Sequence, residues 1–185
     1  MGPSVSVLVG DYWLVKAMEL ILDAEDDNVS AVMRIFAKTL SDLAEGEMLQ
    51  LQKAQSGKPC ESDYLRIIYN KTASLFEATC VSAAMSVGAS DQMIEAARSY
   101  AVALGLAFQI QDDILDVIGN EEVLGKPIGS DAKNDKLTYV SLKGLQTAKE
   151  DVAKLSNEAI SMIKFYEEDN HFLSELTTYL IDREK

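Results

Sequence analysis

The sequence is poor in residues that interrupt helices. Its 185 residues contain ten glycines and only three prolines, at positions 3, 59 and 127, so long stretches are free of helix breakers. This scarcity favours helices over a sheet protein with many turns. With 48% hydrophobic residues, the chain is long enough to bury one substantial core. The sequence therefore predicts an all-α fold with a single helical domain over residues 1–185.

Cysteine and histidine are nearly absent. Cys60 and Cys80 are the only cysteines, and His171 is the only histidine. No Cys-x-x-Cys or Cys/His cluster is present, which argues against a zinc site. A carboxylate-bridged di-iron bundle is disfavoured as well, because it needs Glu-x-x-His pairs on two helices. Two cysteines without a paired spacing are typical of a reducing compartment, so we expect a cytoplasmic protein.

Long apolar runs and positive charge are also scarce. No run of 18 apolar residues occurs, because Asp11 and Lys16 interrupt the most hydrophobic early stretch, and we expect no integral membrane segment. The formal net charge of -13 argues against a nucleic-acid partner. It does not exclude an anionic substrate, provided that metal ions and a few lysines reverse the sign inside the site.

Apolar periodicity and turn residues divide the chain into helices. Residues 4–22 are apolar nearly all round, which predicts a helix buried inside a bundle. Further helices are expected over residues 29–54, 62–87, 91–118, a short stretch from about 138, 147–166 and 171–182. Ser90 is a predicted N-cap, and Thr147 with Glu150 forms a capping-box pattern. Residues 119–135 are rich in turn formers and predict an ordered loop.

Three aspartates stand in an apolar part of the 91–118 helix. At helical spacing Asp112, Asp113 and Asp116 share one face, with Gln109 one turn earlier. Like charges at this spacing oppose helix formation by roughly 0.2–0.5 kcal/mol per pair, and they lie near the negative end of the helix. A solvated acidic face is the alternative interpretation. The apolar neighbours predict burial instead, and oxygen-only ligands of this kind suit Mg²⁺.

Three lysines on other segments could complement the aspartates. Lys126 lies in the predicted loop and Lys136 directly follows it, and Lys71 precedes Thr72 in an apolar part of the 62–87 helix. A lysine in that position either reaches out to solvent, pairs with an acid or binds a ligand. Together, three lysines and three aspartates on separate elements could assemble a magnesium-diphosphate site.

Several segments resemble one family, the trans-polyprenyl diphosphate synthases, in the right order and over nearly the whole chain. Its second aspartate-rich region is similar to Phe108-Gln109-x-x-Asp112-Asp113-x-x-Asp116, Gly125-Lys126-Pro127-x-Gly129-Ser130-Asp131 and Lys136-x-Thr138-Tyr139. Its diphosphate-binding Lys-Thr segment is similar to Lys71-Thr72-Ala73-Ser74-Leu75-Phe76. Its helices are also similar to Glu45-Gly46-Glu47-Met48-Leu49-Gln50-Leu51 and Val9-Gly10-Asp11-Tyr12.

The resemblance implies the isoprenoid synthase helical bundle, with a central cavity that holds an allylic tail. It also implies a homodimer that joins isopentenyl diphosphate head to tail to an allylic prenyl diphosphate. By the same resemblance, Asp112, and less directly Asp113 and Asp116, bind magnesium, while Lys71, Lys126 and Lys136 bind the diphosphate. Thr72 and Gln109 contact the allylic group, and Thr72 also handles the released proton. Glu47 and Gln50 line the cavity.

One part of the family pattern is missing. The family has a first Asp-Asp-x-x-Asp motif followed by adjacent arginines that bind isopentenyl diphosphate, whereas the four arginines here are isolated. We therefore expect an N-terminally truncated bundle that has little or no prenyl transfer activity alone. A non-catalytic or complementing subunit of a heteromeric prenyl synthase is the alternative. A terpene cyclase or head-to-head synthase is a third reading, which the Gly-Lys-Pro and Lys-x-Thr-Tyr segments disfavour.

Overall fold

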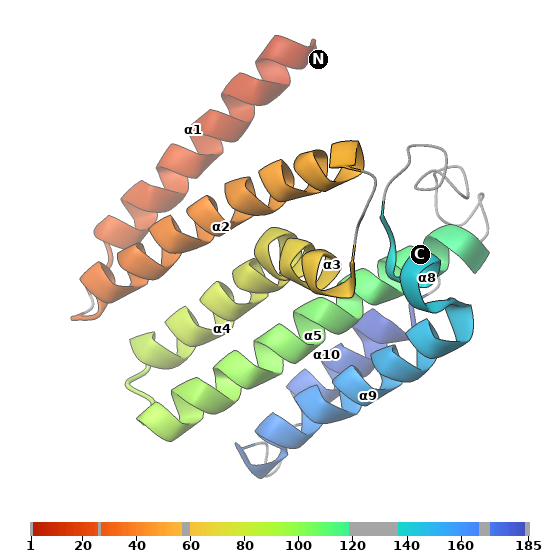
Figure 1. Cartoon of the computed structure of the whole chain (residues 1–185). Helices are drawn as coiled ribbons and strands as arrows, with labels where there is room; N and C mark the ends of the chain where they lie inside the picture. The colour runs from red at the N-terminus through yellow and green to blue at the C-terminus, as the bar shows by residue number, and fades with distance from the viewer. Residues whose placement is uncertain (1, 26, 57–59, 119–136, 167–170, 184–185) are drawn as a thin grey trace.

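All regular elements of the computed structural model, which describes residues 2–25, 27–56, 60–118, 137–166 and 171–183, are helices (Figure 1). They are α1 (Pro3–Leu22), α2 (Val29–Ser56), α3 (Glu61–Ile68), the π-helical turn η1 (Tyr69–Ala73), α4 (Ser74–Ser86), α5 (Asp91–Ile118), α8 (Tyr139–Lys143), α9 (Leu145–Ile163), the 3-10 turn η2 (Lys164–Tyr166) and α10 (Phe172–Ile181). The prediction of an all-α fold is confirmed. Within these ranges, no helix is long and apolar enough to cross a membrane.

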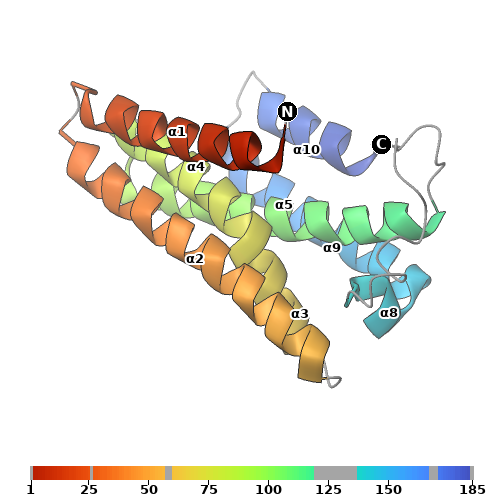
Figure 2. The same cartoon turned by 90° about the horizontal axis from the view of Figure 1, so that it is seen from above.

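The helix α5 lies at the centre of the molecule. It contacts α4 on one side and α9 on the other, and it also touches α8 and α10 (Figures 1 and 2). The side chains of Tyr100, Leu104, Ile110 and Ile114 on this helix are at most 2% exposed. Their removal from water is the main favourable term for folding, at roughly 1.5–3 kcal/mol for each large apolar side chain. The core therefore forms around the helix that carries the aspartates.

The π-helical turn η1 is wedged between α2 and α5. A Cβ atom added to Gly105 of α5 would lie 2.6 Å from the Cα of Ala73, and one added to Gly46 of α2 would lie 2.8 Å from the Cβ of Asn70. Neither glycine has room for a side chain, so both allow close backbone approach. The helix predicted over 62–87 is present, but the sequence pattern gave no sign of the π turn inside it.

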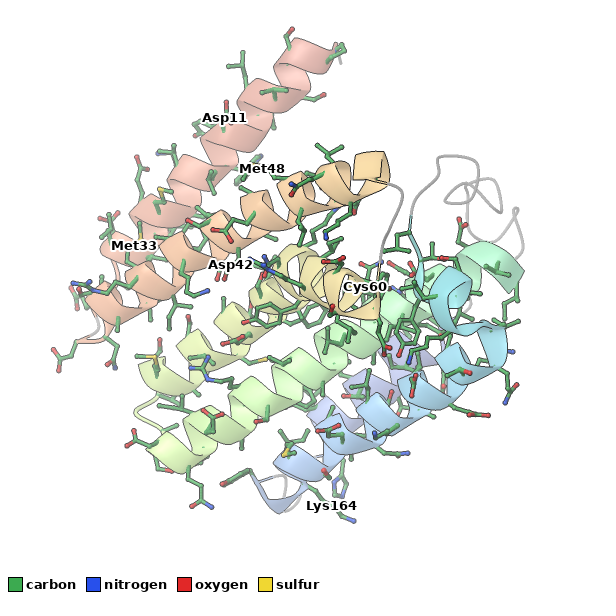
Figure 3. All side chains as sticks on the ribbon, in the orientation of Figure 1. Asp11, Met33, Asp42, Met48, Cys60 and Lys164 are labelled. Atoms are coloured by element: carbon green, nitrogen blue, oxygen red, sulfur yellow. The ribbon has the colours of Figure 1, made fainter. Side chains whose placement is uncertain are left out.

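The helix α1 spans the predicted residues, but the prediction that it is buried is wrong for this chain. It has no buried residue, and Leu8, Trp13 and Leu20 are 66%, 66% and 74% exposed. The helix packs against α2, and its side chains project into open space along much of its length (Figure 3). An all-round apolar helix needs neighbours on several sides, and α2 covers only one.

Two helix starts test the predicted caps. Ser90 is an N-cap as predicted, since its hydroxyl accepts a hydrogen bond from the Met93 amide at 3.3 Å. The capping box predicted at Thr147 is wrong, because α9 already begins at Leu145, after Gly144 with φ 81°. A capping box exists instead at Thr138, whose hydroxyl accepts from the Ser141 amide at 3.1 Å. Serine in place of the usual Glu or Gln hid this box from the sequence pattern.

Candidate active site

Lys71 is paired with side chains of α2. Its Nζ lies 2.5 Å from Glu47 Oε2 and 2.8 Å from Gln50 Oε1. Of the alternatives that the sequence left open for this lysine, pairing with an acid is therefore the one observed. The Glu47 side chain is 53% exposed and that of Lys71 is 29% exposed. Partly exposed ion pairs are weak, so this pair can open for an anionic ligand at small cost.

Thr72 is turned toward α5. Its hydroxyl donates a hydrogen bond to Gln109 Oε1 at 2.9 Å. The structure thus brings together the two residues that the family resemblance implies to contact the allylic group of the substrate. Nearby, the rings of Phe76 and Phe108 are in contact, with centroids 5.6 Å apart. Because Lys71 and Thr72 are consecutive in the π turn, one faces α2 and the other faces α5. The turn therefore presents an ammonium and a hydroxyl to two neighbouring helices.

Asp113 points into the core. It is 1% exposed, and its Oδ2 accepts hydrogen bonds from the Tyr64 hydroxyl and the Tyr139 amide, both at 2.7 Å. Burial, with the adjacent Asp113 carboxylate as the next cause, raises the pKa of Tyr64 above its ordinary range, so this phenol stays protonated and donates. Asp113 thus ties α3 and the start of α8 to α5.

Asp112 has a different environment from its neighbour. Its side chain is 40% exposed and forms an ion pair with the guanidinium of Arg183, just after the end of α10. Asp116, one turn further along, is 2% exposed. The spacing predicted one face for all three carboxylates. In the structure Asp113 and Asp116 are both buried, whereas Asp112 is partly exposed and paired with Arg183.

The carboxylates of this site fit magnesium only if water and substrate oxygens complete the coordination shell of the ion. No group of three or more Asp, Glu, His or Cys side chains gathers into a metal site within the described ranges. Magnesium commonly uses one or two protein carboxylates and completes its shell with waters and phosphate oxygens. Asp112 is a partly exposed carboxylate of the kind that this mode uses, and its ion pair with the guanidinium of Arg183 shows that a cation is accommodated there.

Some predicted site residues cannot be placed. Lys126 and Lys136, with the predicted loop over residues 119–135, lie outside the residues that the structure describes. Two described residues of the site were missed from the sequence. Tyr64 and Arg183 contact the aspartates, but they are distant in sequence from them, at separations of 49 and 71 residues. No spacing pattern links such pairs.

Comparison with known proteins gives a consistent result. The family model described as "Polyprenyl synthetase" matches residues 1–175. The octaprenyl diphosphate synthase of Haemophilus influenzae is 36% identical over 159 residues, which are 86% of this chain and 47% of that protein. The farnesyl diphosphate synthase of Micrococcus luteus is 34% identical over 98% of this chain and 64% of its own length. The chain thus spans about half the length of the first of these relatives.

Solved structures agree with the sequence relatives. The polyprenyl synthase of Caulobacter crescentus, complexed with calcium and isoprenyl diphosphate, superposes with a TM-score of 0.89 at 28% identity, over 100% of this chain and 67% of its own. The polyprenyl synthase of Roseobacter denitrificans gives 0.84 at 26% identity, over 98% and 71%. With the family match over residues 1–175, these likenesses show that the chain belongs to the polyprenyl synthetase family and has its all-α isoprenoid synthase fold.

Proposed function

We propose that this chain carries the allylic-diphosphate half of a magnesium-dependent prenyltransferase site, which joins isopentenyl diphosphate head to tail to an allylic prenyl diphosphate. The observation that carries the proposal is the π turn, which directs Lys71 to α2 and Thr72 to Gln109 of α5. Asp112 follows Gln109 by three residues on the same helix. The turn η1 and the helix α5 thus supply an ammonium, a hydroxyl, an amide and a carboxylate.

Both parts of an allylic diphosphate find suitable side chains on these elements. Lys71 offers an ammonium to the diphosphate, and Lys126 and Lys136 are proposed to add two more. The contacting rings of Phe76 and Phe108 offer apolar surface beside the Thr72–Gln109 pair. The calcium and isoprenyl diphosphate named with the Caulobacter structure support a divalent cation and a prenyl diphosphate as ligands.

The residues have separate roles in the proposed reaction. The allylic carbon–oxygen bond breaks, the double bond of isopentenyl diphosphate attacks the resulting carbocation, and a proton is lost. Lys71 stabilises the departing diphosphate, while Thr72 and Gln109 contact the allylic group, with Thr72 positioned for the released proton. Asp112, with Asp113 and Asp116 less directly, would hold magnesium, which when bound withdraws charge from the leaving group. Glu47 and Gln50 hold the ammonium of Lys71 in place.

The binding of inorganic pyrophosphate with Mg²⁺, measured by calorimetry, tests the proposed site. We expect Lys71→Met to weaken binding by roughly tenfold, the scale of a lost charge-assisted hydrogen bond. Lys154→Met is the matched control, because Lys154 is exposed on α9 and carries the same charge. Equal affinities for the wild type and Lys71→Met would remove Lys71 from the site.

The chain alone is expected to lack most of the prenyl transfer activity. The sequence holds a single Asp-Asp-x-x-Asp motif, so we expect little or no turnover of isopentenyl and farnesyl diphosphates by this chain. Substantial turnover in a radiolabelled prenyl transfer assay would contradict this expectation.

A complementing subunit is the second candidate function, and the exposed apolar helix α1 favours it. A partner chain that bears the first aspartate-rich motif would cover this helix and complete the site; a second copy would form the homodimer implied by the family resemblance.

Both cysteines, Cys60 and Cys80, are free thiols, which supports a reducing compartment such as the cytoplasm.

A further inference from the structure

Arg183 is fixed beside the aspartates by two kinds of contact. Its guanidinium pairs with Asp112 Oδ1, and the same group lies over the ring of Phe108, 3.7 Å from the centroid. The guanidinium also points toward the Phe108 carbonyl oxygen at 3.5 Å. The Arg183 side chain is 17% exposed, whereas that of Asp112 is 40% exposed. The chain therefore closes back from its last described residue onto the acidic part of α5.

These contacts place a positive charge beside a carboxylate near the C-terminal end of α5. A carboxylate near the C-terminal end of a helix, among apolar residues, is unfavourable unless a cation lies close to it. A guanidinium suits this place because it is planar, permanently charged and able to stack on an aromatic ring while it pairs with a carboxylate. Arg183 thus supplies positive charge to Asp112, where the sequence predicted Mg²⁺.

One donor of the Arg183 side chain lacks a partner in the described part of the chain, which favours displacement of this side chain from Asp112. The Nε atom of Arg183 is buried and has no hydrogen-bond partner among the residues that the structure describes. A buried donor without a partner lowers the stability of the state that contains it. A competitor for Asp112 therefore displaces a guanidinium whose hydrogen bonds are incompletely satisfied.

We propose that Arg183 is an internal counter-cation that competes with the divalent metal ion for Asp112, so that metal binding releases the end of α10 from α5. The inference rests on the proposed function, because it takes Asp112 as a metal ligand. Arg183 is then a positioning residue that sets the metal affinity and links the C-terminal segment to loading of the site.

Binding of Mn²⁺, measured by electron paramagnetic resonance with and without inorganic pyrophosphate, tests the proposal. Without its competitor, Arg183→Gln binds Mn²⁺ more tightly by roughly three- to tenfold, the scale expected for loss of a partly exposed ion pair. The matched control is Arg66→Gln, an exposed residue of α3 that removes the same charge elsewhere. Phe108→Leu keeps the arginine but removes the stacking, so it gives a smaller change in the same direction.

Hydrogen exchange supplies a readout that does not depend on affinity. In the wild type, Mn²⁺ with pyrophosphate accelerates amide exchange in peptides that cover residues 172–185, and in Arg183→Gln these peptides already exchange fast without metal. Should Arg183→Gln fail to fold by circular dichroism, Phe108→Leu and the wild-type exchange data decide the matter.

The outcomes separate this inference from the proposed function. If the wild type binds Mn²⁺ but Arg183→Gln binds it equally or less tightly, or if exchange near residue 183 slows with metal, the competition is overturned while the metal site stands. If neither protein binds Mn²⁺, the metal site and the inference both fail.

Discussion

Asp112 and Asp113 are adjacent in sequence, yet their surroundings differ almost completely. Asp113 is 1% exposed and accepts from Tyr64 and Tyr139, whereas Asp112 is 40% exposed and pairs with Arg183. We expect Asp113→Asn to lower the free energy of unfolding by roughly 2–4 kcal/mol, because both buried donors bond to Oδ2 and then lose their charged acceptor. Urea unfolding measures this change. The control Asp112→Asn should cost about 1 kcal/mol or less, and an equal or larger loss there would contradict the assignment.

Tyr69, the first residue of the π turn, gives a prediction about alkaline stability. Burial and a 2.6 Å hydrogen bond to Glu77 raise the pKa of its phenol from 10.0 to about 12. The folded state then binds this proton more tightly than the unfolded state, so the contribution to stability is complete below pH 10.0 and is lost as the pH rises toward about 12.

Urea unfolding at several alkaline pH values measures this loss. Tyr69→Phe should make stability fall less steeply across the window than the wild type, while Tyr179→Phe, which alters a residue 74% exposed on α10, should follow the wild type. Parallel curves for Tyr69→Phe and the wild type would show that this phenol does not contribute.

At the scale of elements, the two glycines that hold the π turn make the packing testable. In Gly105→Ala the new Cβ would meet the backbone of Ala73 at 2.6 Å, so α5 must shift. We expect a loss of roughly 1–3 kcal/mol in unfolding free energy and weaker pyrophosphate binding through displaced Lys71 and Thr72. Gly10→Ala is the control, since no atom lies within 4 Å of its added Cβ and helix propensity there should increase stability. Two equally stable variants would contradict the close packing.

The elements show how far sequence reasoning reaches. Apolar periodicity placed the α2, α5 and α10 helices within one or two residues, because burial on one face of a helix leaves a strong 3.6-residue pattern. It failed for the burial of α1, since periodicity reports the need for neighbours and not their presence. The family resemblance, and not periodicity, gave Lys71, Thr72 and Gln109 as residues of one site. Neither gave the contacts of Tyr64 and Arg183, which depend on how distant segments pack. The single domain over residues 1–185 stays a prediction.

For the whole molecule, the exposed apolar helix α1 favours self-association, whereas the net negative charge opposes it. We expect the purified chain to self-associate, and to do so more at high salt, because screening reduces the repulsion between chains of net charge -13. Sedimentation velocity measures this association. Leu20→Gln on α1 should weaken it several-fold, whereas Val87→Gln, at the end of α4 and 80% exposed, should not.

Trp13 provides an independent check, as the only tryptophan and 66% exposed. Its fluorescence should move to shorter wavelength when α1 is covered by another chain. A chain that stays monomeric at all salt concentrations, with unchanged Trp13 emission, would contradict an interface on α1.

The π turn has one more consequence, which concerns the angular phase of the helix. Ile68 and Ala73 are both buried at five residues apart, whereas the buried residues Ser74 and Ala78 beyond the turn are four apart. An α-helix advances by about 100° per residue, so the extra residue rotates α3 relative to α4 by that angle. Deleting one residue of the turn would preserve the helix but turn Tyr64 away from Asp113. Residue count in this short stretch, more than residue type, keeps the two ends of the helix facing their separate partners.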